Sequence, residues 1–300
     1  MLKIAYHSIY KHNLPLGHRF PMDKYDLLPQ QLLYEGTCIR ENFFTPEIPN
    51  NKYFFMVHDA EYVSDLMNIS LSQKAARKIG FPLSEDLIKR EMIIADGTMM
   101  ASKYAIQNGI SMNIAGGTHH AFTNRGEGFC LLNDQAIGAR YLQEKKLAEK
   151  ILIIDLDVHQ GNGTAEIFQN DESVYTFSMH GESNYPFHKE KSDLDIPLEN
   201  GTDDTTYLSI LKETLPKLIA IQKPNFIYYL CGVDVISTDK LGKLSLTTEG
   251  CKERDRFVLQ SCKDLDIPLM CSMGGGYSPN INTIVNAHAN TFRLAQEIFF

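Results

Sequence analysis

Short apolar runs alternate with longer amphipathic segments along the whole chain. The apolar runs predict strands at Leu2–Tyr6, Ser111–Ala115, Lys150–Val158, Val174–Met179, Asn225–Gly232 and Pro268–Met273. The longer segments predict helices at Ser84–Asn108, Asp134–Ala148, Asp204–Ile221, Thr247–Leu265 and Asn282–Phe300. Such alternation predicts an α/β fold in which helices cover both faces of a central, mostly parallel β-sheet.

The residues that flank these segments indicate helix ends and loops. Ser84, followed by two acidic residues, has the pattern of a helix N-cap, and Gly109 has the pattern of a helix stop. The stretch Lys11–Pro49 is rich in proline, asparagine and aromatic residues, so we expect a surface loop region there. No internal repeat or low-complexity linker interrupts the chain, which predicts a single domain over residues 1–300.

Composition narrows the possible functions. Hydrophobic residues make up 43% of the chain, which is enough for a large core. The formal net charge is −8, and charges of both signs are mixed along the chain. Direct binding to nucleic acid would need a basic patch, so this balance argues against it.

Cysteine usage and hydropathy bear on the compartment. The six cysteines are scattered without a Cys-x-x-Cys pair, and several lie in apolar runs, which is typical of a reducing compartment. The N-terminal string MLKIAYHSIY predicts a short strand rather than a signal peptide. No apolar segment approaches the roughly 18–20 residues of a membrane span. We therefore expect a cytoplasmic protein without a membrane span.

The string ILIIDLDVHQGNG carries the first cluster of polar residues at a strand end. Side chains at i, i+2 and i+4 of a strand share a face, so Asp155, Asp157 and His159 are expected to point the same way. Burying two carboxylates with an imidazole is costly unless a cation compensates them. A capped strand end in solvent explains this motif equally well when it is taken alone.

Three other predicted strands are followed by polar groups. Paired glycines precede His119 and His120, and would let the backbone turn tightly and present two imidazoles, although ordinary loop histidines explain the pair as well. Asp234 follows a second apolar run, where an isolated Asp is more often a helix N-cap. Tyr277 follows three glycines, a pattern also expected of a turn with a packing tyrosine.

Taken together, these groups predict one site, because ligands of such sheets bind at the carboxyl ends of the strands. A metal set of Asp157, His159 and Asp234 leaves a position for water, as a catalytic zinc site requires. The adjacent imidazoles would then serve as bases for the water, and Tyr277 would donate to an oxyanion.

These strings carry a family resemblance. GGTHHAF, GEGFCLLND, DLDVHQGNG, CGVD and GGGY follow one another between residues 116 and 277. In this ordered set, which spans most of the chain, the sequence closely resembles the histone deacetylase and acetylpolyamine amidohydrolase superfamily, whose fold is arginase-like. The HQGNG, DKLGKLSL and HRFPMDKY strings are most similar to the class IV deacetylases and their bacterial relatives.

The resemblance implies a metal and two bases. Asp157, His159 and Asp234 would bind zinc, although carboxylate-rich ligation would also accept Fe(II) or Co(II). His120 would take the proton of the attacking water and return it to the leaving amine, while His119 would act mainly through its charge.

The same resemblance implies partners for these bases and an oxyanion donor. Asp155 and Asn162 would accept the second ring N–H of His119 and His120, respectively, and so fix the tautomers. Tyr277 would donate to the tetrahedral oxyanion.

Substrate and monovalent cation sites also follow from the resemblance. Phe129 would form a wall of an acyl-lysine tunnel, although a lone aromatic residue belongs to the core equally often, and the Gly128 carbonyl could accept the substrate amide N–H. The family's inner potassium site would use Asp155, Ser178 and Met179 with the backbone of Asp157 and His159. A second monovalent site near Phe168 and Val174 is a weaker match.

Two departures from the family pattern matter. Gln160 and Asn162 replace the second His and the Asp of HHGDG, as in the class IV branch, and the loss of a carboxylate beside His120 should leave that base more readily neutral. The segment Ile79–Ser84 is short where relatives carry a loop with a peptide-binding Asp, a role that Asp86 cannot safely be given. A wide or shallow entrance is therefore one expectation.

The remaining polar residues carry weaker implications. Arg19 would by analogy line an acetate exit channel, and a structural salt bridge is an equally good interpretation. The other histidines have no metal-ligand spacing and are expected to be structural or exposed: His7, His12, His18, His58, His180, His188 and His288.

The leading hypothesis is a zinc-dependent deacylase that acts on acyl-lysine in proteins, with an acetyl or a longer acyl group. The same chemistry on a small amine such as an acetylpolyamine is the main alternative. A non-catalytic acyl-lysine binder is disfavoured by the intact His119, His120 and Tyr277. A two-metal ureohydrolase is disfavoured because Asp234 is followed by Val and Ile. The oligomeric state is left open.

Overall fold

The computed structural model describes residues 1–300 and contains one eight-stranded sheet whose paired strands all run parallel. The order across the sheet is β2-β1-β3-β8-β7-β4-β5-β6. The strands are β1 (Lys3–Ala5), β2 (Phe43–Phe44), β3 (Ile110–Asn113), β4 (Ile151–Asp155), β5 (Val174–Gly181), β6 (Leu194–Leu198), β7 (Phe226–Leu230) and β8 (Leu269–Ser272).

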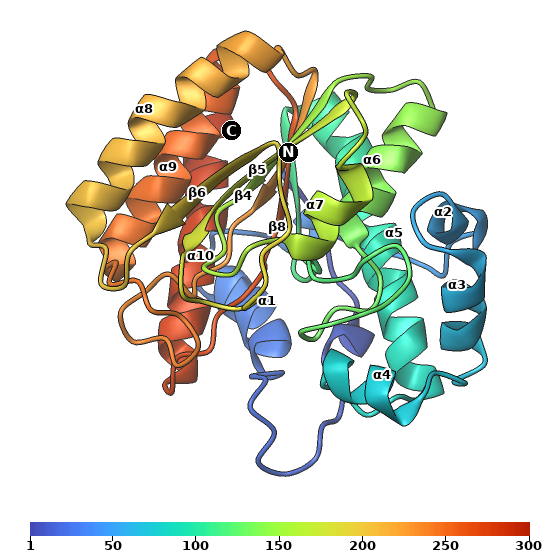
Figure 1. The fold of residues 1–300 in the computed structure, drawn as a ribbon. Coiled ribbons are helices and arrows are strands. Elements are labelled where there is room, and N and C mark those ends of the chain that lie inside the picture. The colour runs from blue at the N-terminus through green and yellow to red at the C-terminus, as the bar shows by residue number, and fades with distance from the viewer.

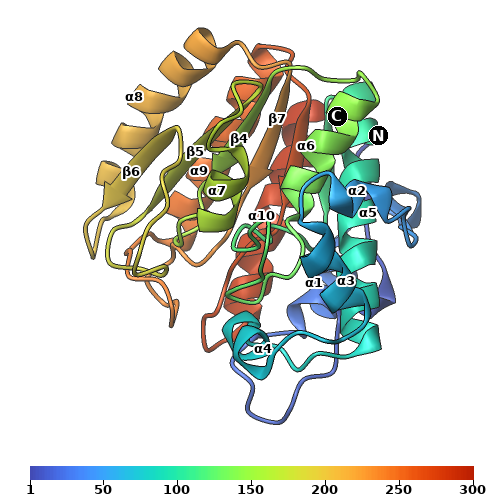
Figure 2. The ribbon, with the colours of Figure 1, turned by 45° about the vertical axis from the view of Figure 1, so that its right-hand side comes forward.

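Ten α-helices flank this sheet and confirm the predicted α/β class. They are α1 (Lys24–Tyr34), α2 (Lys52–Phe55), α3 (Ala60–Met67), α4 (Gln73–Ile79), α5 (Glu85–Asn108), α6 (Asp134–Glu144), α7 (Asn162–Phe168), α8 (Asp204–Gln222), α9 (Thr248–Asp264) and α10 (Ile281–Phe299), with 3-10 turns at Ser8–Tyr10 and Arg40–Asn42. Helices α8 and α9 lie on one side of the sheet, and α5 and α6 lie on the other (Figure 1, Figure 2).

The central strands β3, β8, β7 and β4 are buried along their whole length. Helices on both faces exclude water from them, which explains why these segments are nearly continuous apolar runs rather than alternating patterns. One connected cluster of buried apolar side chains extends from Leu2 to Ala295. The polar groups that follow these strands therefore emerge from a rigid, dry platform.

The helix-end signals were predicted correctly for α5. The Ser84 hydroxyl accepts a hydrogen bond from the Leu87 N–H at 3.1 Å, and the helix ends at Gly109, whose φ of 83° suits a residue without a Cβ. All six cysteines are buried free thiols. None of the helices combines the length and the apolar content that a bilayer crossing requires.

The predicted surface loop at Lys11–Pro49 is wrong for its middle part. Helix α1 forms there, and its Lys24, Tyr25 and Leu28 are buried, with α10 packed alongside. Pro29 lies inside the helix, and its presence with several polar residues obscured the helical period in the sequence.

Strand β6 was also missed, because Asp195 and Pro197 break its apolar run. It is the edge strand of the sheet, where a proline removes no hydrogen bond from a central ladder.

Candidate active site

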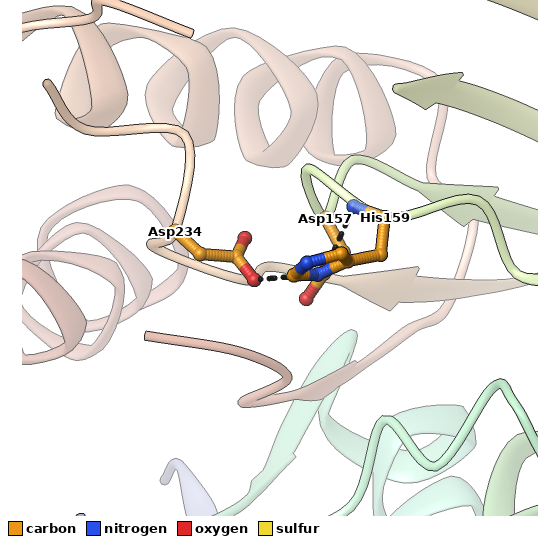
Figure 3. Close-up of side chains that lie close together, drawn as sticks. All are labelled: Asp157, His159 and Asp234. Carbon is orange, nitrogen blue, oxygen red and sulfur yellow. Dashed lines mark hydrogen bonds and ion pairs between the residues drawn. The ribbon is translucent and has the colours of Figure 1, made fainter. Parts of the chain in front are cut away.

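The site is built by the segments that follow β3, β8, β7 and β4, four neighbours in the sheet. Strand β4 ends at Asp155, so Asp157 and His159 lie in the segment beyond it rather than on one strand face as predicted. These two residues nevertheless turn towards Asp234, which follows β7 (Figure 3). The convergence comes from the shared edge of the sheet and not from strand periodicity.

Asp157, His159 and Asp234 form the one group in the structure with metal-ligand geometry. One candidate ligand atom from each lies within 4.8 Å of the others, and all three residues are buried. The His159 Nδ1 atom is 3.0 Å from Asp157 Oδ1 and 3.1 Å from Asp234 Oδ2 (Figure 3). Neighbouring buried carboxylates of this kind are costly without a compensating cation.

The backbone fixes one oxygen of each carboxylate. The Gly275 N–H donates to Asp157 Oδ2 at 2.8 Å, and the Val158 N–H donates to Asp234 Oδ1 at 3.0 Å. The second oxygen of Asp234 is buried; it lies 3.1 Å from His159 Nδ1 but accepts no well-aligned hydrogen bond. A Cβ at Gly275 would collide with this same oxygen, so the glycine keeps the space beside it open.

The pKa of Asp234 also indicates that this cluster suits a cation. Burial and the neighbouring Asp157 carboxylate raise the pKa of Asp234 to about 7. An Asp/His/Asp donor set with one buried oxygen that accepts no well-aligned hydrogen bond fits a divalent ion of the zinc type, because such an ion takes three protein ligands at a catalytic site.

The two histidines that follow β3 have different partners. His119 Nδ1 lies 2.6 Å from Asp155 Oδ2, and His120 Nδ1 lies 2.6 Å from Asn162 Oδ1. The imidazoles are stacked at a tilt, with ring centroids 4.1 Å apart. An amide oxygen can only accept, so the His120 Nδ1–H donates and its Nε2 keeps the lone pair when the ring is neutral.

The pKa values of these histidines shift in opposite directions. Burial lowers the pKa of His120 well below its ordinary value, and the neighbouring His119 lowers it further. Burial would also lower the pKa of His119, but the Asp155 carboxylate raises it above the ordinary value. The surroundings thus favour the neutral form of the His120 imidazole and the charged form of the His119 imidazole.

Asp134 holds the loop that carries both histidines. Its Oδ1 accepts from the N–H groups of Gly117 and Thr118, each at 2.9 Å, and its Oδ2 accepts from the Thr98 hydroxyl at 2.7 Å. The carboxylate therefore ties the glycine turn to α5. The sequence analysis identified Asp134 only as the start of a helix, because its partners are distant in sequence.

Tyr277 is oriented by a second carboxylate that the sequence analysis missed. Asp239 Oδ2 accepts from the Tyr277 N–H at 2.6 Å, while its Oδ1 accepts from the N–H groups of Leu241 and Gly242. The spacing of Asp239 and Gly242 indicates a turn in the sequence, but it does not indicate the contact with Tyr277. The Tyr277 ring is in edge contact with the His159 ring, at 6.4 Å between centroids.

Phe129 and Tyr185 line the cavity together with His120. Phe129 has a φ of +69°, a strained conformation for a large side chain, and its ring packs on Phe20 and Phe81. The Tyr185 ring meets His120 edge-on at 4.9 Å, and its hydroxyl donates to Glu127 Oε2 at 2.7 Å. Tyr185 was not singled out from the sequence, because a lone tyrosine before a proline has many structural explanations.

Gly128 lies against the same base. Its φ is +51°, and a Cβ here would come within 2.8 Å of His120 Cδ2. A side chain at this position would therefore push on the imidazole, so close approach of the backbone requires glycine.

An open cavity of about 390 Å³ leads from the surface to this site. His120, His159 and Tyr277 line its floor and also line a smaller chamber of about 40 Å³ that continues inwards beside Phe20 and Arg90. The site is therefore reached through a mouth much wider than its interior.

The candidate potassium residues lie on adjacent strands. Asp155 on β4 pairs in register with Ser178 on β5, so Met179 is one residue further along. The Ser178 hydroxyl is 2.9 Å from His180 Nδ1. This arrangement puts the proposed ligands side by side behind His119.

Arg19 and the short segment Ile79–Ser84 meet at the cavity. The Arg19 guanidinium lies over the Phe129 ring at 4.9 Å and forms no ion pair, so of the two interpretations of Arg19 the structural salt bridge is wrong. Phe81 from the short segment packs on Phe129, while Asp86 lies exposed on α5. A polar anchor for peptide is thus not supplied by this segment.

A profile of the family described as "Histone deacetylase domain" matches residues 18–292. The chain belongs to the histone deacetylase family. Its homologues therefore support a hydrolase that acts on amides.

Full-length and partial relatives accompany this match. An uncharacterized protein of Picosynechococcus is 43% identical and aligns over 99% of both chains. Histone deacetylase 2 of Arabidopsis thaliana is 27% identical over 87% of this chain and 70% of its own length. Human histone deacetylase 1 is 28% identical over 87% of this chain, which spans only 58% of the human protein.

Solved structures share the deacetylase fold. The HDA15 HD domain superimposes with a TM-score of 0.82 at 20% identity, over 97% of this chain and 87% of that one. A histone deacetylase homologue complexed with SAHA gives a TM-score of 0.83 at 23% identity, over 97% and 82%. At this identity the likeness concerns the fold alone, which is the arrangement that the sequence motifs predicted.

Within this deacetylase fold, Gln160 has a structural contact of its own. Its side-chain amide donates to the Glu190 carbonyl at 2.6 Å and to Asp195 Oδ1 at 2.8 Å, and its oxygen accepts from the Glu190 N–H. The residue that replaces a histidine of the HHGDG pattern thus ties Glu190 and strand β6 to the loop that carries the candidate metal ligands.

Proposed function

We propose that the protein is a zinc-dependent deacylase that hydrolyses the amide of an N-acyl-lysine, with an acetyl or longer acyl group. The observation that carries the proposal is the buried cluster of Asp157, His159 and Asp234, whose Asp234 Oδ2 accepts no well-aligned hydrogen bond, next to the His120 imidazole with its lowered pKa. Family membership supplies the reaction class, and this donor set supplies a reason for a divalent metal.

Asp157, His159 and Asp234 would hold the metal. When bound, such an ion polarises the scissile carbonyl and lowers the pKa of the attacking water towards about 7. The proposal also includes a structural potassium ion held by Asp155, Ser178 and Met179, with the backbone carbonyls of Asp157 and His159.

The proton is handled by the chain itself. The Nε2 lone pair of His120 accepts the proton of the attacking water and returns it to the leaving amine nitrogen. The Asn162 oxygen holds the ring through Nδ1–H, so Nε2 faces the reaction in the basic tautomer. His119 pairs with Asp155, which raises its pKa and favours its charged form, so it would stabilise negative charge that develops on the acyl oxygen.

Tyr277 stabilises the oxyanion. Burial raises the pKa of its hydroxyl well above the ordinary value, with Asp234 and Asp157 adding to the shift, so it stays a protonated donor at neutral pH. Phe129 and Tyr185 would flank the acyl-lysine stem, and the Gly128 carbonyl would accept the amide N–H.

The test is hydrolysis of defined substrates by protein reconstituted with Zn²⁺. Acetyl-, myristoyl- and trifluoroacetyl-lysine peptides should release free amine, and acetylpolyamines provide the small-substrate arm. Asp157→Ala should abolish turnover because it removes a metal ligand. If Asp157→Ala is as active as the parent protein, the metal mechanism is wrong.

Tyr277→Phe separates an enzyme from a binder. It removes only the oxyanion donor, so kcat should fall by about 10²–10³ while peptide binding persists. Tyr34→Phe is the matched control, because that ring is 94% exposed. Stoichiometric metal with no turnover on any acyl-amine would instead favour a non-catalytic acyl-lysine binder.

A further inference from the structure

The mouth of the active-site cavity is lined by cations and by no carboxylate. Arg19, Lys78 and Lys243 are the charged side chains at its wall, together with the site histidines. They come from three separate segments of the chain and are all exposed. The rest of the wall is apolar or neutral, including Phe187, which is 85% exposed.

Two of these cations have no carboxylate to neutralise them. Arg19 forms no ion pair and stacks on the Phe129 ring. The Lys243 ammonium donates to the Ser183 carbonyl at 3.0 Å and to its hydroxyl at 3.3 Å, and no carboxylate is in contact with it. Both charges therefore remain available to a bound molecule.

Glu127, the acid beside the mouth, is already fully engaged. Its Oε1 pairs with Arg125 at 2.8 Å and lies 3.5 Å from the Lys78 ammonium, while its Oε2 accepts from Tyr185. The side chain is only 12% exposed. It partly offsets Lys78, but it offers nothing to a cationic substrate.

For a molecule bound at the mouth, the cations there outweigh the negative net charge of the protein. The net charge of −8 is spread over the whole surface, and salt screens it beyond a Debye length of about 8–10 Å. A substrate in the mouth is in contact with Arg19 and Lys243, so their field decides the interaction there.

We propose that the mouth selects acyl-lysine substrates that carry a carboxylate near the lysine backbone, at the outer end of the acylated stem. This inference rests on the proposed deacylase function and names its substrate class. The carboxylate would come from acidic residues that flank an acyl-lysine in a peptide, or from the α-carboxylate of free acyl-lysine. A polycation such as an acetylpolyamine is disfavoured because it meets three like charges.

The test compares matched peptides in which acyl-lysine is flanked by Asp, Asn or Lys, together with free Nε-acetyl-lysine and its amide. Zn²⁺-loaded protein is assayed for kcat/KM, and the Kd of each peptide is measured by fluorescence anisotropy with Tyr277→Phe. The Asp-flanked peptide should exceed the Asn-flanked one by about three- to tenfold in both readouts. The ratio should shrink at high salt.

Neutralising the mouth should remove the preference. In the double variant Arg19→Gln, Lys243→Gln the Asp-to-Asn ratio falls to about one. The matched control Lys103→Gln, Lys212→Gln removes two exposed charges that do not line the cavity, and it keeps the parent ratio. A preference of the free amino acid over its amide, without one among the peptides, identifies the α-carboxylate as the source.

The outcomes separate this inference from the proposed function. Equal binding and turnover of Asp- and Asn-flanked peptides, together with no preference for free Nε-acetyl-lysine over its amide, overturns the charge selection even if the enzyme is active. A preference for Lys-flanked peptides overturns it as well. An Asp preference in Kd with no hydrolysis of any acyl-amine supports the charge selection and overturns the deacylase instead.

Discussion

The two histidines of the GGTHH loop share their neighbourhood and differ in one partner atom. Each ring nitrogen Nδ1 lies 2.6 Å from an oxygen, but His119 faces the carboxylate of Asp155 and His120 faces the amide of Asn162. Both side chains are buried, so solvent does not distinguish them. The pKa of His119 is raised by its carboxylate, whereas burial lowers the pKa of His120.

This contrast shows how two equal residues can take different roles. A charged partner raises the pKa of its imidazole, so that ring holds a second proton more readily and is a poorer acceptor for another. A neutral partner orients its imidazole without charging it, so the ring remains a base. Variants of each His–partner pair can therefore test the roles proposed for His119 and His120.

Removing the rings themselves should have the largest effect. His120→Ala removes the base and should lower kcat by about 10²–10⁴. His119→Ala removes a charge but no proton acceptor, so its loss should be smaller. Steady-state kinetics with both variants, loaded with metal and checked for the same fold by circular dichroism, tests the order. A greater loss for His119→Ala would reverse the assigned roles.

Replacing the carboxylate partner of His119 by an amide, as at His120, should have an intermediate effect on activity. Asp155→Asn removes the carboxylate that raises the pKa of His119, so the pKa of the ring should fall and its charged form should be less favoured. We expect kcat/KM to fall by about 10- to 100-fold, as is usual when a hydrogen-bond partner of a site residue is lost. The exposed Asp264→Asn serves as control. Unchanged activity would show that the charge of His119 is dispensable.

Replacing the amide partner of His120 by a carboxylate, as at His119, should have the smallest effect on activity. Asn162→Asp places a carboxylate on His120 and raises its pKa by about one unit or more. The base works when neutral, so activity is present above its pKa and is lost as the pH falls through it. The acidic limb of kcat/KM should move to higher pH, with the loss confined to acidic pH and little change near pH 8. An unmoved limb would mean that another group controls it.

The sequence predicted the central sheet and the polar residues at its edge for the same reason. Buried parallel strands are continuous apolar runs, and a charged residue such as Asp234 directly after one is conspicuous. What could not be predicted depends on contacts distant in sequence. Asp134 and Asp239 have the local patterns of a helix start and a turn, yet each holds a loop of the candidate site that is distant in sequence.

The mouth of the cavity was equally hidden in the sequence. Arg19, Lys78 and Lys243 belong to loops and a short helix end without periodicity, so nothing local indicates that they meet. Helix α1 was missed nearby, because Pro29 masked the periodicity of a segment whose Lys24 is fully buried.

The central claim is that adjacent imidazoles carry different charges, and nuclear magnetic resonance of their ring nitrogens tests it most directly. Metal-loaded protein labelled with ¹⁵N-histidine would be titrated between about pH 5 and 8, where histidines change charge, with His119→Gln and His120→Gln used to assign the signals. The account predicts that His119 takes up its second proton at a higher pH than His120, which stays a neutral Nδ1–H tautomer near pH 7. Simultaneous titration, or protonation of His120 first, would contradict it.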